Sequence, residues 1–399
     1  MKYWLKLYDE NLINFTMNGN GINFNVDINF YAGDRRDVMP IGIDGTSESL
    51  SAWLKSRIIP PNRAYADNIL NCMGFTAGTG DTAGIIDFCK GLSINDSYWV
   101  VPEDFDGYFS KYNLYENKFP EFLALTSLTG ESIPEHEARQ TKISPEFTTG
   151  GTLPKAWRRV DGKIILYKSG IWEKYEGTDD FPEPYSEYYA CQLADRMGIP
   201  QISYGLSRWK GILCSTCELF TDADTSYVPI SGAVRGNPQN TPDYYLKVSE
   251  WYKSYDYKNG TDLYDNFASM ITFDALIYDG NRHPDSFGVL RNNKSGRIIA
   301  SAPIYNNGKS LFNHLPFTEL EKIDEYRKAY INHFKNPFDE TVKKFCSIKQ
   351  NQQLQKLIGF KFKKDKHYNW PPERLQIIQE FIRKRVLELL DVTPAQSHP

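Results

Sequence analysis

The sequence lacks the long apolar runs and the excess of one charge that direct a protein to a membrane or to nucleic acid. No stretch approaches the ~18–20 apolar residues of a membrane-spanning helix, and the first residues show no signal-peptide pattern. The 399 residues carry 46 Lys+Arg against 50 Asp+Glu, a net charge of −4. A dedicated nucleic-acid binder is usually strongly basic. We therefore expect a cytoplasmic protein without membrane contact or direct nucleic-acid binding.

Cysteine and histidine are scarce, with six of each. Six cysteines in so long a chain do not suggest a disulfide framework and fit a reducing compartment. Cys214 and Cys217 have the spacing of a zinc or redox pair, but no second pair accompanies them and the nearest histidine is His283. The apolar residues on both sides favour two ordinary positions of a β-strand, with a metal or redox role as the alternative.

Aromatic residues are plentiful, with 26 Tyr, 23 Phe and 8 Trp, which excludes low-complexity disorder. The local pattern changes along the chain. Residues 1–130 mix short strands and helices, and the polar stretch 131–143 connects them to the rest. Strand patterns then dominate 144–220, and helical patterns dominate 221–395. We predict an α+β protein with these three parts.

Two strand-like runs, Glu146–Trp157 and Lys163–Lys168, flank Asp161-Gly162, which is typical of a hairpin turn. The first run contains a loop rich in glycine and threonine. Because glycine has no Cβ, backbone N–H groups in such a loop can approach phosphate oxygens closely. An ordinary hairpin remains the alternative, since the Walker A pattern is absent. The candidate nucleotide-binding residues of this loop are Thr148, Thr149, Gly150, Gly151 and Thr152.

Lys168 ends the second of these strands, and Glu187 follows 19 residues later. A helix is predicted over Ser186–Met197 with Ser186 as its N-cap, which would place Glu187 in the first turn. Protein kinases pair a strand lysine with a glutamate of the next helix to hold the α- and β-phosphates of ATP. A solvated lysine at a strand end is the alternative.

Two polar loops follow the apolar run Phe273–Tyr278. The first spans Asp279–Gly288, and the second spans Ala302–Leu311 after a strand-like segment. This is the layout of a catalytic loop followed by a metal-binding loop. The last segment, Pro372–Leu390, has apolar residues at helical spacing and predicts a terminal helix.

Taken in order, the Gly/Thr loop, the strand lysine, the helix glutamate and the two loops resemble the HipA-like kinase family. These are bacterial Ser/Thr kinase-fold proteins, often found in toxin–antitoxin systems. The resemblance covers roughly residues 144–395. Its most specific matches are Arg282-His283, Phe287-Gly288, Ala302-Pro303, Gly308 and Ser310-Leu311.

The resemblance implies a two-lobed protein-kinase-like fold with an additional N-terminal α/β segment. It places a hinge near Glu218–Thr221, with Glu218 and Phe220 beside the nucleotide. The implied cofactor is ATP with Mg²⁺, and the implied partners are a nucleotide and a protein such as an antitoxin. The short basic stretch Lys361–Lys366 leaves a DNA-associated role as a weaker alternative.

Three positions depart from the family's pattern together. The resemblance implies an Asp base where Asn281 stands, and Asn and Asp ligands of Mg²⁺ where Ser286 and Asn306 stand. Loss of a general base lowers a rate by roughly 10²–10⁴, and Mg²⁺ prefers carboxylate oxygen. We therefore expect a pseudokinase that binds a nucleotide, with weakened use of Mg²⁺. These three residues are either the natural ones or deliberately introduced replacements that inactivate the protein.

Two nearby carboxylates keep other functions open. Asp279 lies two residues before Asn281, and Asp285 directly precedes Ser286. Either would allow an active toxin-type Ser/Thr kinase, or a transferase that moves the nucleotide instead of the γ-phosphate. Loop surface and helix capping are the structural alternatives for both.

Overall fold

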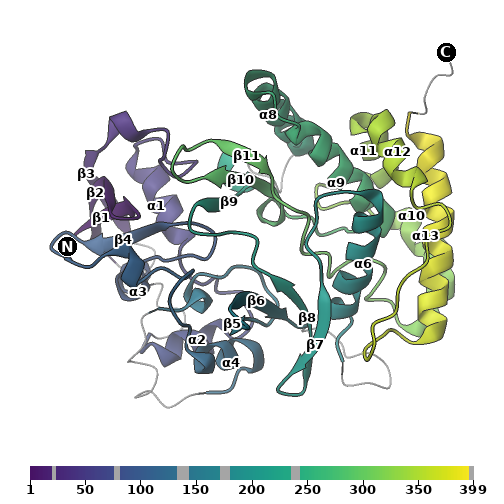
Figure 1. Ribbon diagram of the computed structural model, residues 1–399, viewed down its shortest axis with the longest axis horizontal. Helices are drawn as coiled ribbons and strands as arrows, with labels where there is room; N and C mark the ends of the chain where they lie inside the picture. The colour runs from purple at the N-terminus through teal and green to yellow at the C-terminus, as the bar shows by residue number, and fades with distance from the viewer. Residues whose placement is uncertain (20–23, 76–80, 133–142, 171–179, 235–242, 395–399) are drawn as a thin grey trace. The chain divides into compact units, whose positions relative to one another are not determined.

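The computed structural model describes most of the chain, and the described residues are 1–19, 24–75, 81–132, 143–170, 180–234 and 243–394 (Figure 1). The chain forms two compact units. Unit 1 consists of Met1–Ile171, Glu218–Val228 and Leu290–Ile298. Unit 2 consists of Trp172–Cys217, Pro229–Val289 and Ile299–Pro399. The three-part division by sequence pattern stays a prediction. Within the described residues, no helix is long and apolar enough to span a membrane.

Unit 1 begins with an antiparallel sheet of order β3-β2-β1-β4. Its strands are β1 (Lys2–Leu7), β2 (Glu10–Asn18), β3 (Asn25–Tyr31) and β4 (Tyr98–Pro102). Alternate residues of β1 are buried, as the period of a strand requires. Helix α1 (Ser47–Lys55) packs on the sheet through Leu50 and Leu54. The Thr46 side chain caps α1 by accepting a hydrogen bond from the backbone N–H of Ser49.

Three more helices of unit 1 share a core with the Gly/Thr loop. They are α2 (Ala66–Cys72), α3 (Thr82–Cys89) and α4 (Glu121–Thr129). The ring of Phe147, which directly precedes the loop, is fully buried among apolar side chains of these helices. Trp157 and Ile164 of the following hairpin pack in a second core with Trp99 of β4. The N-terminal residues and the hairpin therefore fold against each other.

The predicted hairpin is confirmed as β5 (Lys155–Val160) and β6 (Lys163–Lys168). Its turn residues Asp161 and Gly162 have φ values of 48° and 80°, as a type I′ turn requires. The strand predicted from Glu146 is wrong before Lys155. Residues Pro145–Phe147 form a short 3₁₀ helix, and no strand is assigned between them and β5. Two prolines and two glycines in this stretch disfavour a β-ladder.

A buried arginine fixes the start of the Gly/Thr loop. Arg63 donates through Nη2 to the Glu146 carboxylate at 2.6 Å, and the ion pair is almost fully buried. The same guanidinium donates to the carbonyl oxygens of Glu146, Thr149 and Lys155 at 2.7, 3.1 and 3.0 Å. One side chain from the N-terminal part of the chain thus holds both ends of the loop.

Unit 2 begins with helix α6 (Glu183–Met197). The predicted cap is wrong, because the helix starts three residues before Ser186 and its N-cap is Pro182. Pro184 lies in the first turn, where a missing N–H costs nothing. The Ser186 hydroxyl instead donates to the carbonyl of Ser310 at 3.3 Å. Glu187 therefore lies in the second turn and is completely buried.

The strands β7 (Gly205–Trp209) and β8 (Ile212–Glu218) pair as an antiparallel hairpin. Cys214 and Cys217 lie on β8, and both side chains are buried. Residues three apart on a strand point to opposite faces, so the two thiols cannot chelate one metal. The interpretation as ordinary strand positions is confirmed.

Helix α9 is the centre of unit 2 (Figure 1). It contacts α8, α11, α12 and α13, which explains why nearly every residue of α9 is buried. The helices of this group are α8 (Tyr244–Asn259), α9 (Leu263–Ile277), α11 (Phe338–Phe345), α12 (Ile348–Gln355) and α13 (Pro372–Val392). The predicted terminal helix is confirmed as α13.

Shorter elements complete the chain. The strands β9, β10 and β11 form a sheet of order β11-β10-β9, and the chain passes between the two units within these strands. The remaining strands and α-helices are β9 (Thr225–Pro229), β10 (Gly288–Asn292), β11 (Ile298–Ser301), α7 (Ile230–Ala233) and α10 (Ile323–Ala329).

We predict that Arg63→Met lowers the free energy of unfolding by about 3–5 kcal/mol, because it leaves the Glu146 carboxylate buried without its cation. Chemical denaturation measures the loss. The control is Arg35→Met, which removes a half-exposed ion pair with Glu10 and should cost at most about 1 kcal/mol. Equal losses in the two variants would contradict a structural role for the buried pair.

Candidate functional site

The predicted site residues fall into two sets, one in each unit. Unit 1 holds Thr148, Thr149, Gly150, Gly151, Thr152, Lys168, Glu218 and Phe220. Unit 2 holds Glu187, Asp279, Asn281, Asp285, Ser286 and Asn306. The pairing of Lys168 with Glu187 joins the two sets and stays a prediction.

The end of α9 shapes the first loop. The helix stops at Tyr278, whose backbone is left-handed, with φ 54° and ψ 50°. The next residue, Asp279, is buried, and its Oδ1 accepts a hydrogen bond from the backbone N–H of Asn281 at 2.9 Å. Asp279 therefore shapes the turn that presents Asn281. The Asn281 side chain is half-buried and makes no hydrogen bond to the described residues.

Arg282 joins the first loop to α9. Its guanidinium is completely buried and donates to Asp274 of α9, at 2.7 Å from Nη2 and 3.1 Å from Nε. A second carboxylate, that of Asp279, lies 3.2 Å away. These carboxylates raise the pKa of Arg282 despite the opposing effect of burial. Arg282 is a structural brace, since all its near charges are buried protein groups.

The same guanidinium reaches the second loop. It donates to the carbonyl oxygen of Tyr305 at 2.5 Å and to the amide oxygen of Asn307 at 2.7 Å. The backbone N–H of Asn307 donates in turn to the Glu187 carboxylate at 2.8 Å. A Cβ on Gly308 would lie 3.3 Å from the other Glu187 oxygen. Arg282 and Glu187 together fix the second loop against α9 and α6.

Asn306 and Ser286, the two positions of the expected metal ligands, face each other. Asn306 has a φ of 63°, a left-handed conformation that asparagine tolerates. Its Nδ2 donates to the Ser286 hydroxyl at 3.1 Å. Its backbone N–H donates to the Tyr204 hydroxyl at 3.2 Å. The fold thus brings these two predicted residues together as a neutral pair.

These residues do not fit a magnesium ion. Mg²⁺ prefers anionic oxygen ligands, whereas this pair consists of an amide group and a hydroxyl hydrogen-bonded to each other. In the part of the chain that the structure describes, no three His, Cys, Asp or Glu side chains gather closely enough to hold a metal ion. The Asn306–Ser286 pair therefore lacks the negative charge that kinases use to hold the metal.

Asp285 is the exposed carboxylate of the first loop. Its Oδ2 lies 3.1 Å from Nδ1 of His283, and 63% of its side chain is exposed. Hydrogen bonding to His283 lowers the pKa of Asp285, so the carboxylate is ionised at neutral pH. Asp279 is buried beside Arg282. Of the two alternative carboxylates, Asp285 is the one that solvent and a ligand can reach.

In unit 1, the Gly/Thr loop uses its threonine hydroxyls internally. Thr148 Oγ1 donates to the carbonyl of Leu92 at 2.8 Å, and Thr149 Oγ1 donates to the carbonyl of Pro145 at 2.7 Å. Gly150, Gly151 and Thr152 are exposed at the tip. The exposed backbone at this tip fits the predicted approach to a phosphate better than the hydroxyls of Thr148 and Thr149 do.

Sequence reasoning missed Lys155, the first residue of β5. Its side chain is buried, and Nζ donates to the carbonyl of Gly150 at 2.8 Å. A lysine six residues after a Thr-Thr pair carries little signal by itself, since its position under the loop depends on the fold of the loop. The ammonium group places a positive charge directly beneath the glycine pair.

The remaining residues of unit 1 lie on β6 and on the predicted hinge. Lys168, at the end of β6, is buried. Glu218 forms an exposed ion pair with Lys163 at 2.7 Å. The Phe220 ring packs edge-on against Tyr227, with ring centroids 5.6 Å apart. The backbone N–H of Leu219, between these two residues, donates to the carbonyl of Ile164 at 2.9 Å.

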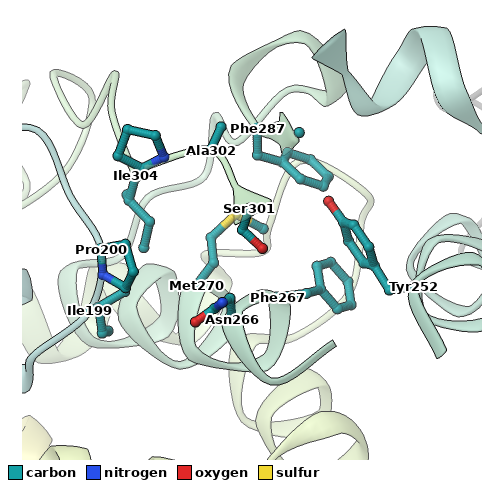
Figure 2. Close-up of a pocket in the computed structure, with 12 residues that line it drawn as sticks. Ile199, Pro200, Tyr252, Asn266, Phe267, Met270, Phe287, Ser301, Ala302 and Ile304 are labelled. Atoms are coloured by element: carbon teal, nitrogen blue, oxygen red, sulfur yellow. The ribbon is translucent and has the colours of Figure 1, made fainter. Parts of the chain in front are cut away.

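A small apolar pocket lies beside the second loop of unit 2 (Figure 2). The rings of Tyr252, Phe267 and Phe287 line one side, and Ser301 contributes a buried hydroxyl without a hydrogen-bond partner among the described residues. The cavity of about 20 Å³ has room for a water molecule. None of the predicted site residues lines it, so it is not the predicted nucleotide site.

The geometry defines a class of fold: an α+β protein of the protein-kinase type, with a helix leading into two braced loops. Comparison with solved structures supports this class of fold. The chain is similar to HipA of Shewanella oneidensis MR-1, solved with HipB and its operator DNA. The TM-score is 0.52 at 11% identity, over 98% of this chain and 99% of that chain. At this identity the likeness shows the HipA-like kinase fold alone.

A second similar structure is the Helicobacter pylori proinflammatory kinase CtkA. The TM-score is 0.44 at 14% identity, over 61% of this chain and 91% of that chain. No family model matches the sequence, and no curated protein matches it.

The Arg282 brace predicts a pH dependence of stability. Burial raises the pKa of Asp274 to about 7, with Arg282 opposing the shift and Asp279 adding to it. The folded state then binds more protons than the unfolded state between about pH 4 and 7, so the free energy of unfolding falls as pH rises through this window.

Asp274→Asn removes this contribution. We expect the stability of the variant relative to the parent protein to improve from pH 4 to 7, as measured by denaturation across that range. Asp265→Asn, on the more exposed side of the same helix, is the matched control. If the free energy of unfolding depended on pH in the same way in the parent protein and in Asp274→Asn, a proton bound at Asp274 would be ruled out.

Proposed function

We propose that this chain is a HipA-like pseudokinase, which binds a nucleotide and acts by binding or regulation instead of efficient phosphoryl transfer. The observation that carries the proposal is the neutral Asn306–Ser286 hydrogen bond at the two positions where the family has metal ligands. Asn281 at the position of the base supports it, because an amide is a poor proton acceptor. The hydrogen bonds of Arg282 to Asp274, Tyr305 and Asn307 hold the two loops in place. The loops therefore keep their shape although positions 281 and 306 carry no carboxylate.

In unit 1, the proposal assigns nucleotide binding to the exposed tip of the Gly/Thr loop. Backbone N–H groups at Gly150 and Gly151 would contact phosphate oxygens, and the Lys155 ammonium beneath them adds positive charge. Lys168 would contact the α- and β-phosphates, with Glu187 orienting it. Glu218 and Phe220 would lie beside the base of the nucleotide. Bound ATP would supply the phosphates that these groups recognise.

A protein partner is also part of the proposal. The similar Shewanella HipA was solved with HipB and operator DNA, and we propose by analogy an antitoxin-like protein as the partner of this chain. The net charge of −4 argues against direct binding of nucleic acid by the whole surface. A cytoplasmic location fits such a role.

The test is calorimetric titration of the full-length protein with ATP, with and without Mg²⁺. We expect binding whose affinity changes little when Mg²⁺ is added, because the site lacks an anionic metal ligand. Lys168→Met should weaken binding, whereas Lys163→Met, on the same strand in an exposed ion pair, should not. Tight binding that depends on Mg²⁺ would contradict the proposal.

Restoring the family's residues is a separate prediction. We expect the triple variant Asn281→Asp, Ser286→Asn and Asn306→Asp to gain Mg²⁺-dependent ATP binding. Its ATP hydrolysis should rise by roughly 10²-fold or more, the value of a general base. Released phosphate measures the rate, and Asn281→Asp alone is the partial control. A folded triple variant that stays inactive would count against a simple loss of the catalytic groups.

An active kinase is the second candidate, and the exposure of Asp285 is the observation that favours it. A transferase that moves the nucleotide is the further form of this alternative. ATP labelled at the α-phosphate and at the γ-phosphate distinguishes these two reactions. Transfer of the γ-phosphate label alone to an acceptor indicates a kinase. Transfer of the α-phosphate label indicates that the nucleotide is moved.

A further inference from the structure

The loop that leads from α12 into α13 carries a cluster of lysines outside the candidate site. Its residues 360–369, which we call the lysine loop, include four exposed lysines within six positions. These are Lys361, Lys363, Lys364 and Lys366. Among the residues that the structure describes, none of the four forms an ion pair. The one acid between them, Asp365, accepts hydrogen bonds from the backbone N–H groups of His367 and Tyr368 at 2.8 and 3.0 Å.

The backbone of the lysine loop is fixed by glutamine side chains of two helices. Gln192 of α6 donates to the carbonyl of Lys363 at 3.1 Å and accepts from the Lys363 N–H at 2.8 Å. Gln379 of α13 accepts from the Phe362 N–H at 2.9 Å and donates to the carbonyl of Phe360 at 3.0 Å. Each glutamine amide therefore pairs with the loop backbone through one donated and one accepted bond, as a neighbouring strand does.

A third amide closes the lysine loop. The Asn369 side chain donates to the carbonyl of Asp365 at 2.8 Å and accepts from the Asp365 N–H at 2.7 Å. It also accepts a hydrogen bond from the Tyr189 hydroxyl of α6 at 2.9 Å. The Phe362 ring packs against Tyr189 and Phe360, with ring centroids 5.2 and 5.1 Å apart. The four lysines are thus carried on a backbone that α6 and α13 hold in one shape.

Holding like charges together in this way costs stability. The Cα atoms of Lys361 and Lys366 can lie at most roughly 18 Å apart even on an extended chain. Adjacent lysines therefore fall within about one Debye length, about 8 Å at physiological salt, and repel each other. A surface that serves stability and solubility alone has charges of both signs interspersed. A fixed cluster of one sign is instead typical of a surface that attracts a partner of opposite charge.

The surroundings of the lysines favour an acidic protein segment over nucleic acid. Single-stranded nucleic acid is held by aromatic faces on which bases stack, together with a basic track along the backbone. The rings here are engaged in the protein, since Phe360 and Phe362 pack on each other and the Arg208 guanidinium lies 5.3 Å from the ring centroid of Tyr368. The basic stretch is short, and the net charge of −4 on the whole chain repels a long polyanion. A short run of carboxylates matches the length of the cluster.

We propose that the lysine loop is a docking surface for an acidic segment of a protein partner. Carboxylates of the segment pair with the four ammonium groups and relieve the repulsion between them. Because the loop backbone is already ordered by Gln192, Gln379 and Asn369, binding spends little free energy on ordering the loop. The inference rests on the protein partner of the proposed function, and it does not depend on nucleotide binding.

The experiment measures the binding of a fluorescent hexaglutamate peptide to the full-length protein by anisotropy at low and physiological salt. We expect an affinity that falls as salt rises, because exposed ion pairs are screened. The double variant Lys363→Gln and Lys364→Gln should weaken binding by about 5–30-fold, the contribution of two exposed ion pairs. Its free energy of unfolding should not fall, because amide side chains and not the lysines hold the loop. Chemical denaturation checks this.

The matched control is the double variant Lys322→Gln and Lys328→Gln, which removes two exposed lysines of the same unit and changes the net charge equally. It should leave the affinity for hexaglutamate unchanged. Equal losses in the two double variants would show attraction by overall charge and overturn the docking surface. Tighter binding of a single-stranded deoxythymidine decamer than of hexaglutamate, through the same two lysines, would assign the surface to nucleic acid and overturn the proposal.

ATP binding is measured by calorimetry on the same samples. ATP binding without hexaglutamate binding would overturn the docking surface alone. Hexaglutamate binding without ATP binding would support the docking surface and overturn the nucleotide binding of the proposed function.

Discussion

One buried positive charge organises the loops of unit 2. The Arg282 guanidinium lies between Asp274 and Asp279 and also donates to the backbone of Tyr305 and the side chain of Asn307. A buried cation is stable only with such partners, so the two loops and α9 must keep their mutual positions whenever the unit is folded. The geometry of the candidate site follows from this electrostatic requirement.

The acidic groups of the unit therefore divide into two kinds. Asp274 and Asp279 are buried beside Arg282, and Glu187 holds the second loop through the Asn307 amide. Asp274, Asp279 and Glu187 thus serve the structure of the loops. The positions that the resemblance to HipA-like kinases assigns to the metal and the proton are neutral, as Asn281, Ser286 and Asn306. Different side chains thus hold the framework of the loops and occupy the positions proposed for chemistry.

Sequence reasoning succeeded where local chemistry decides the structure. Asp161-Gly162 predicts the hairpin, since both residues accept a left-handed backbone, and the apolar spacing of Pro372–Leu390 predicts α13. It failed where distant contacts decide. The Ser186 hydroxyl bonds to Ser310 instead of capping a helix, and the stretch after Glu146 is held by Arg63 from far along the chain. Short-range patterns do not record such long-range hydrogen bonds.

The attachment of the Gly/Thr loop to the N-terminal helices has a thermodynamic consequence. The backbone N–H of Ala64 donates to the carbonyl of Thr152 at 2.9 Å, and Phe147 is buried among α2, α3 and α4. A ligand that binds and orders the loop would therefore also stabilise these helices. By reciprocity, a molecule that binds the helices would change the affinity of the loop for its ligand. The stability of the loop and that of the N-terminal helices are therefore linked through this shared core.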